Sequence, residues 1–242
     1  MNRTTTLNGP SVQHTSSAED QAIPPLENGD RLTRPDFERR YEAMPHVKKA
    51  ELIEGAVYMP SLVRMLQHAR PHSWIIIWLG AYYVTTPGVD LGDNPSDRLD
   101  LDNEPQPDAL LRIARGGSSR IGEDGFLEGP PELIVEVASS TVSIDLHDKK
   151  DVYRRNGVQE YLVWAVAQEA LFWFVLREGR YDPLAPDGHG VVRSEVFPGL
   201  WLATRPLLNG DLPAVLQCVR QGTASQEHAA FVRRLAGADA GT

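Results

Sequence analysis

The chain has 242 residues and a composition ordinary for a soluble globular protein, and this length suits one compact domain with or without appendages. A formal net charge of -9 argues against a broad electropositive coat for tight non-specific nucleic-acid binding, although it allows a local basic cleft. The single cysteine, Cys218, excludes an internal disulfide and a zinc site built on several cysteines, and it indicates a reducing, cytoplasmic compartment.

Composition divides the chain into three regions. Residues 1–30 are rich in Thr, Ser, Asn, Gly and Pro and contain no signal-peptide core, which predicts a flexible N-terminal leader. Residues 31–207 form the predicted domain, and residues 208–242 form a predicted helical extension packed on it. The most hydrophobic stretch, WIIIWLGAYYV at 74–84, is too short to span a membrane, so we expect a buried helix and no membrane partner.

The first half of the domain predicts helices and short strands. A short helix over 34–44 is followed by two strands that turn near Glu54 and Gly55. A helix over about 62–86 comes next, bent near Pro71. Extended segments are then expected at GVDLG, RLDLDN and QPDALLRIA, and a glycine-rich loop at RGGSSRIGEDG.

The second half centres on the strand PELIVEVASS at 131–140. A helix should follow it, with Ser139, Ser140 or Thr141 as N-cap and its end at Gly157. EYLVWAV and EALFWFVLR predict paired strands, and the tail predicts one or two amphipathic helices. Together these elements indicate an α/β or α+β domain with a mixed central sheet flanked by helices.

The strand at 131–140 carries an acid where apolar residues are expected. Glu136 has apolar neighbours on both sides in sequence, and an ionised carboxylate costs several kcal/mol to bury unless it is paired or binds a metal. On the following helix, Val142, Leu146, Lys149 and Tyr153 share one face by their spacing. Lys149 therefore points inward and is the nearest candidate partner for Glu136.

A second acid stands in QPDALLRIA. Alternation along the presumed strand places Asp108 on one side with Leu110 and Arg112. Two acids from separate strands and one inward lysine make a plausible site for a divalent cation, because Mg²⁺ takes one or two carboxylates and fills its other positions with water and phosphate. His68 and His72 are four residues apart, but Pro71 between them favours a packing role over chelation.

These motifs resemble the Uma two family of the PD-(D/E)XK restriction-endonuclease-like superfamily. The resemblance rests on ELIEGAVYM, the PD pair ending at Asp108, ELIVEV, and DLHDKKDVYRRNGVQEYLVW, and it runs from about residue 45 to about 205. It implies a restriction-endonuclease-like core with an extra N-terminal hairpin and C-terminal helices. It also implies a metal-dependent endonuclease that hydrolyses phosphodiester bonds of nucleic acid, with DNA as the expected substrate and Mg²⁺, or Mn²⁺ in its place, as the cofactor.

The resemblance also assigns residues. It implies that Asp108 and Glu136 hold the metal and that Lys149 completes the catalytic set, because Ala138 occupies the position of the superfamily's usual lysine. Asp145 could hold Lys149 in place, and either Glu51 or Glu54 could be the first acidic motif. A backbone carbonyl near Val137 would add a metal ligand. Three basic residues of the same helix could contact the nucleic-acid backbone without reading bases: Lys150, Arg154 and Arg155.

Each of these residues could instead have a purely structural role. Glu136 and Lys149 could be a structural ion pair, Asp108 could cap a turn, and the basic helix residues could form a solvated face. The whole protein could be an inactive nuclease-fold module that binds nucleic acid or protein. For the enzyme, a homodimer is plausible because cutting both strands is simplest with two sites. We expect Asp108→Asn or Lys149→Ala to abolish cleavage while thermal unfolding stays nearly unchanged.

Overall fold

The structure is a computed structural model, which describes residues 23–59 and 64–239 together with Met1. Most of the expected leader, residues 2–22, lies outside the described residues, as do residues 62 and 63 of the predicted second helix. Near the end of the expected leader, Leu26 is buried in a small hydrophobic cluster, so packed structure begins before residue 31.

A six-stranded mixed sheet forms the centre of the molecule, with strand order β11-β10-β9-β8-β5-β3. Only β8 and β9 pair in parallel, and the other neighbours are antiparallel. The predicted pairing of EYLVWAV with EALFWFVLR is confirmed, since Ala165 faces Ala170 and Glu160 faces Val175. The strands are β3 (Val89–Asp93), β5 (Ala109–Ile113), β8 (Leu133–Ala138), β9 (Glu160–Ala165), β10 (Ala170–Arg177) and β11 (Arg180–Pro183).

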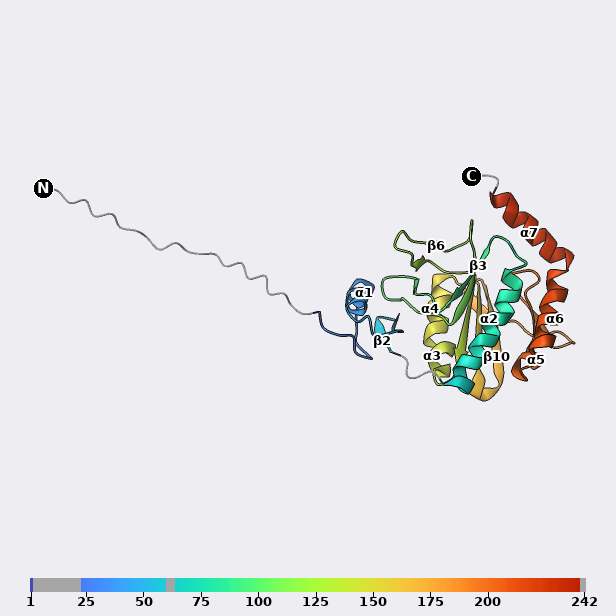
Figure 1. Ribbon diagram of the computed structural model, residues 1–242, viewed down its shortest axis with the longest axis horizontal. Helices are drawn as coiled ribbons and strands as arrows, with labels where there is room; N and C mark the ends of the chain where they lie inside the picture. The colour runs from blue at the N-terminus through green and yellow to red at the C-terminus, as the bar shows by residue number, and fades with distance from the viewer. Residues whose placement is uncertain (2–22, 60–63, 240–242) are drawn as a thin grey trace.

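Helices cover both faces of this sheet (Figure 1). Helices α3 (Val142–Leu146) and α4 (Asp148–Asn156) connect the parallel strands β8 and β9, as such a pair requires. Alternate residues of β8 serve the two faces: Ile134 and Ala138 pack with Tyr153 of α4, whereas Val135 packs against α2 (Arg70–Tyr83). Glu136 therefore belongs to the face that α3 and α4 cover.

The segment after β8 differs from the single helix expected there. His147 has φ -123° and ψ -83°, and these values end α3 and separate it from α4. Thr141 is the N-cap residue of α3 by position, but its hydroxyl donates to Asp145 at 2.6 Å and makes no hydrogen bond to a helix N–H. Gly157 ends α4 as predicted, with φ +89°, a left-handed conformation that glycine adopts without strain.

The second predicted helix is irregular at its start. A π-helical turn, η1 (Met65–Ala69), runs directly into α2, and Pro71 lies where the π-helical turn gives way to the α-helix. The apolar stretch at 74–84 is largely in α2, whose side chains Ile75, Trp78 and Leu79 are fully buried. The helix is present as predicted, but it is buried along one side only, because Ile77, Tyr83 and Val84 are exposed. No helix of the described chain is long and apolar enough to cross a membrane.

Smaller elements surround the central sheet. Helix α1 (Arg34–Glu42) and the predicted hairpin of β1 (Glu51–Ile53) and β2 (Ala56–Tyr58) lie beyond α4 (Figure 1), and share a cluster with Leu26. A second sheet has the order β4-β7-β6, and part of the expected glycine-rich loop is in it, because Arg120 and Ile121 pair with Glu128 and Leu127. Its strands are β4 (Asp97–Arg98), β6 (Arg120–Ile121) and β7 (Leu127–Glu128).

The predicted C-terminal helices pack outside α2. Val215, Val219, Phe231 and Leu235 from these helices join α2 and the sheet in the largest hydrophobic cluster. A short hairpin of β12 (Val191–Arg193) and β13 (Trp201–Ala203) and a single-turn helix, η2 (Val166–Gln168), complete the described elements. The three helices are α5 (Thr204–Leu208), α6 (Leu212–Thr223) and α7 (Gln226–Asp239).

Candidate active site

Asp108 and Glu136 face each other across two neighbouring strands. Strands β5 and β8 are antiparallel, with Ala109 opposite Val135, so extending the register by one pair sets Asp108 opposite Glu136. Both side chains are buried, with 3% exposure each. Cross-strand neighbours on one face have Cβ atoms about 4.5–5.5 Å apart, which is close enough for the two carboxylates to share an ion. The register thus places the two acids side by side, as the prediction of a shared site requires.

Lys149 points inward, as its helical spacing predicts. Its Nζ donates to Glu51 Oε1 at 2.8 Å and to Glu136 Oε1 at 3.0 Å, and it lies 3.7 Å from Asp145 Oδ1. The side chain is only 6% exposed. Glu136 Oε1 also accepts a hydrogen bond from Tyr153 Oη at 3.0 Å, one turn further along α4. The buried acid of the central strand thus has a cationic partner and a hydroxyl donor.

The structure separates the two candidates for the first acidic motif. Glu51 on β1 is buried and contacts Lys149, and its Oε1 also accepts the Gln106 N–H at 2.8 Å. Glu54 lies at the exposed turn of the hairpin with φ +51° and pairs with Arg155. Glu51 therefore joins Asp108, Glu136 and Lys149, whereas Glu54 does not.

Asp108 is held by both the backbone and a lysine that the sequence analysis did not single out. Its Oδ2 accepts the Val137 N–H at 2.8 Å, and its Oδ1 lies 3.3 Å from Lys49 Nζ. Burial would raise the pKa of Asp108, but the charges of Lys49 and His68 and the Val137 N–H outweigh it, so this pKa lies below its ordinary value. Asp108 is therefore ionised at neutral pH.

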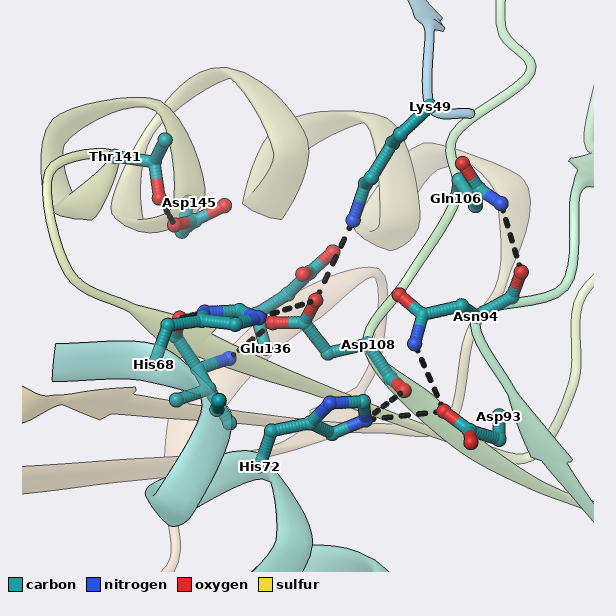
Figure 2. Close-up of polar contacts among 12 residues, drawn as sticks. Lys49, His68, His72, Asp93, Asn94, Gln106, Asp108, Glu136, Thr141 and Asp145 are labelled. Atoms are coloured by element: carbon teal, nitrogen blue, oxygen red, sulfur yellow. Dashed lines mark hydrogen bonds and ion pairs between the residues drawn. The ribbon is translucent and has the colours of Figure 1, made fainter. Parts of the chain in front are cut away.

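Two histidines on the η1–α2 segment also reach this site (Figure 2). His68 bonds through Nδ1 to the Val137 carbonyl at 3.0 Å, and its Nε2 lies 3.5 Å from Asp108 Oδ1. His72 bonds through Nε2 to the Asp108 carbonyl at 2.9 Å and lies 3.1 Å from Asp93 Oδ1. Both rings make polar contacts beside Asp108, in addition to packing against each other with ring centres 5.6 Å apart. The Val137 carbonyl expected to face a metal is occupied by His68.

The whole cluster carries more negative than positive groups. Four carboxylates stand against two ammonium groups, those of Lys49 and Lys149. Burial would lower the pKa of Lys149, but the surrounding carboxylates outweigh this and raise it well above its ordinary value. Burial raises the pKa of Glu136, and neighbouring acids add to this effect, although Lys149 opposes it. The carboxylates are those of Glu51, Asp108, Glu136 and Asp145.

Asp145 has the position expected of a support for Lys149. It is buried, accepts the Thr141 hydroxyl at 2.6 Å, and lies one helical turn before Lys149. Burial raises its pKa, whereas Lys149 and Thr141 lower it. The kink at His147 leaves Asp145 and Lys149 on the same side, so the break in the helix does not displace the lysine from the acids.

The three basic residues proposed to touch nucleic acid have partners within the chain. Lys150 Nζ lies 3.7 Å from the centre of the Phe174 ring, and Arg154 donates to the Gly179 carbonyl at 3.1 Å. Arg155 pairs with Glu54 on the hairpin. Lys150 and Arg154 point toward β10 and the turn after it, so they are not included in the candidate site.

The carboxylate oxygens of the cluster are the kind of donor that a hard divalent cation takes. No group of three or more His, Cys, Asp and Glu side chains in the described part of the chain could hold a metal ion by itself. Asp108 and Glu136 nevertheless supply the one or two carboxylates that Mg²⁺ typically takes from a protein. Both hydrogen bonds that described residues give to Glu136 go to Oε1, so Oε2 is the oxygen left for another partner.

Comparison with known sequences gives a family match over most of the chain. The sequence profile of the family named Uma2, described as "Putative restriction endonuclease", matches residues 34–205. This range begins before and ends at the range expected from the motifs. No curated protein matches the chain.

A solved structure has a similar fold. It is a crystal structure described as "a putative nuclease belonging to DUF820" from Anabaena variabilis. The two chains are 12% identical, the match covers 71% of this chain and 96% of that one, and the TM-score is 0.55. At this identity the likeness shows the fold, and it confirms the predicted mixed sheet flanked by helices.

Proposed function

The chain belongs to the Uma2 family, described as "Putative restriction endonuclease", and from this premise we propose that it is a metal-dependent nuclease that hydrolyses phosphodiester bonds of DNA. Family membership supports the general class, a nuclease. The finer assignment of cofactor and substrate rests on the chemistry of the cluster around Glu136.

One observation carries the proposal: Asp108, directly before β5, lies opposite Glu136 on β8, and Glu136 is bound to the Lys149 ammonium at 3.0 Å. A structural ion pair would need only one acid and one lysine. Here four buried acids stand against two lysines, an arrangement that is expensive unless a further cation enters or an acid keeps its proton. The pKa of Glu136, raised to about 8 mainly by burial, shows that this acid is ionised readily only when a cation is near, which supports a divalent-cation site.

We propose Mg²⁺, with Mn²⁺ as a substitute, held by Asp108 and Glu136. When bound there, the ion would supply the polarisation of a phosphate oxygen and the acidification of a water molecule. Lys149 would hold Glu51 and Glu136 in fixed positions through its two short hydrogen bonds. The Val137 N–H would do the same for Asp108. In the reaction a water oxygen bonds to phosphorus while the bond from phosphorus to one ester oxygen breaks.

Cleavage of plasmid DNA by the purified chain tests this function. We expect nicking or linearisation in Mg²⁺ or Mn²⁺ and none in EDTA. Asp108→Asn should reduce cleavage at least about 100-fold, because it removes a charged metal ligand. The amide oxygen of Asn can still accept the Val137 N–H, so the melting temperature should stay within a few degrees of the wild-type value.

A matched control distinguishes the loss of a site residue from the loss of any negative charge on the protein. Asp102 is exposed, and Asp102→Asn should cleave as the parent does. Equal cleavage by the Asp108→Asn variant would show that the activity comes from a contaminant or from another site. Absence of cleavage in either metal, with DNA binding retained, would favour the inactive binding module instead.

The proposed enzyme acts as a homodimer in a reducing, cytoplasmic compartment. Two copies would supply one site for each strand of a duplex, and the lone buried thiol of Cys218 suits a reducing environment. Sedimentation equilibrium of the full chain tests the dimer, which a monomer at micromolar concentration would contradict.

A further inference from the structure

Two lysines enter the acidic cluster, and their surroundings differ. Lys149 contacts three carboxylates and its side chain is 6% exposed, so its ammonium group is enclosed. Lys49 has a side chain that is 24% exposed, and the hydrogen bond it makes with the described residues is a long one, 3.3 Å, to Asp108 Oδ1. The Lys49 ammonium group therefore has N–H donors available for a further partner, and part of its side chain is accessible to solvent.

The local sequence explains why Lys49 points into the site. Lys49, Ala50, Glu51 and Leu52 alternate in direction as extended residues do. Ala50 and Leu52 are buried in the hydrophobic cluster beneath the hairpin, and Lys49 and Glu51 project to the other side, toward Asp108 and Lys149. Figure 2 shows Lys49 reaching Asp108 from one side while His68 and His72 approach it from the other.

The charge of Lys49 is secured by its neighbours. Its ammonium group lies 3.3 Å from Asp108 Oδ1, and Glu51 projects from the same side of the extended segment. At neutral pH the side chain is a cation that rests on the carboxylate proposed to bind the metal. A single long contact is easily exchanged for a phosphate oxygen when that carboxylate takes another cation.

We propose that Lys49 is the catalytic lysine that contacts the phosphate to be cleaved, and that Lys149 is a positioning residue for the acids. This assignment rests on the proposed nuclease function and changes the role that the family resemblance implied for Lys149. An ammonium group is a strongly hydrated point charge with three donors, which suits a phosphate oxygen whose negative charge grows during the reaction.

The test compares Lys49→Met with Lys48→Met in the full-length protein. Lys48 is the adjacent lysine and is exposed, so both variants lose one positive charge from the same segment. On a DNA duplex in Mg²⁺, we expect Lys49→Met to lower kcat about 100-fold with a smaller change in KM, because the contact strengthens in the transition state. Lys48→Met should change kcat less than about threefold, and Lys49→Arg should recover part of the loss.

Two further measurements exclude a merely structural role. The Lys49→Met variant should melt within about 2 °C of the wild-type protein, and it should bind Mn²⁺, followed by electron paramagnetic resonance, at least as tightly as the wild type. Unchanged kcat would overturn the proposal, as would a loss of cleavage that is fully explained by unfolding or by weaker Mn²⁺ binding.

The design also separates this inference from the proposed function. If the wild-type chain cuts no DNA, the nuclease assignment fails, and fluorescence anisotropy with a duplex oligonucleotide still tests Lys49. An affinity that falls at least tenfold in Lys49→Met, but not in Lys48→Met, would support a phosphate contact at Lys49. Equal affinities in the two variants would overturn it.

Discussion

Lys149 is the residue on which the arrangement of the acidic side chains depends. It is buried among Glu51, Glu136 and Asp145, so Lys149→Met would leave three carboxylates close together without their cation. Removing one partner of a buried ion pair costs about 3–5 kcal/mol. We expect a loss of this size in the free energy of unfolding, measured with urea.

This expectation replaces the one drawn from sequence, in which Lys149→Ala leaves thermal unfolding nearly unchanged. A second substitution checks the cause. Glu51→Gln in the Lys149→Met background removes one unpaired charge, and it should restore at least about 1 kcal/mol of the lost stability. A loss below about 1 kcal/mol in the single variant would mean that solvent reaches the ammonium group.

Asp97 is a buried acid outside the site, and from its burial we expect the stability of the folded protein to depend on pH. Neither of its carboxylate oxygens has a hydrogen-bond partner among the described residues. Burial, with the nearby charge of Glu104, raises the pKa of Asp97 well above its ordinary value, and burial raises the pKa of Glu104 to about 8. The folded state therefore keeps protons that the unfolded chain releases.

Stability should accordingly be full below the ordinary carboxyl pKa and should fall as pH rises toward about 8. Asp97→Asn removes one of the two charges, so the melting temperature at pH 8.5 should rise by about 3 °C or more, with a smaller change at pH 5. Differential scanning calorimetry at both pH values measures this. Asp102→Asn removes the same charge at an exposed position and should shift the melting temperature little, and equally, at pH 5 and pH 8.5. Equally small shifts of the melting temperature in Asp97→Asn at the two pH values would refute the prediction.

At the scale of elements, the close approach of α6 to the β12–β13 hairpin depends on a glycine. A Cβ atom at Gly222 would lie 2.2 Å from the Gly199 carbonyl oxygen and 2.9 Å from the Trp201 ring. Gly222→Ala must push the helix away from the hairpin, and overpacking of this kind costs about 1–3 kcal/mol. We expect a melting temperature lower by about 5 °C, measured by calorimetry.

A second helical glycine provides the control. Gly237 in α7 has open space around the position of a Cβ, so Gly237→Ala should stabilise the protein by up to about 1 kcal/mol through helix propensity alone. Neither substitution touches the acidic cluster, which lies on the opposite face of the sheet from α6, so DNA cleavage per folded molecule should be unchanged. Equal melting temperatures for the two variants would show that the hairpin yields to α6 without cost.

The elements themselves were largely predictable from sequence, for reasons of periodicity. Alternation in β5 correctly separated Leu110 from Leu111, and the steps of three and four placed Lys149 and Tyr153 inward. The break at His147 was not predictable, because the spacing before and after it fits one continuous helix. The kink is a tertiary effect that lets Asp145 and Lys149 meet the same group of acids.

At the scale of the molecule, the sequence predicted some residues of the site and missed others. Asp108, Glu136 and Lys149 stand in local patterns that predict direction, so their convergence followed from the elements. Lys49 and His68 were harder to place, because each is far from Asp108 in sequence and their shared contact depends on the tertiary fold. A search for charged residues on the polar side of the hairpin strand, two residues from Glu51, would have found Lys49.

The segments that meet at Asp108 also set an order of events during synthesis. Lys49 and His68 belong to the first third of the chain, whereas Lys149 is residue 149 of 242. The reactive groups can therefore come together only after the chain has been made through Lys149, 100 residues beyond Lys49. The cluster must assemble after the hairpin that carries Glu51 has already been synthesised.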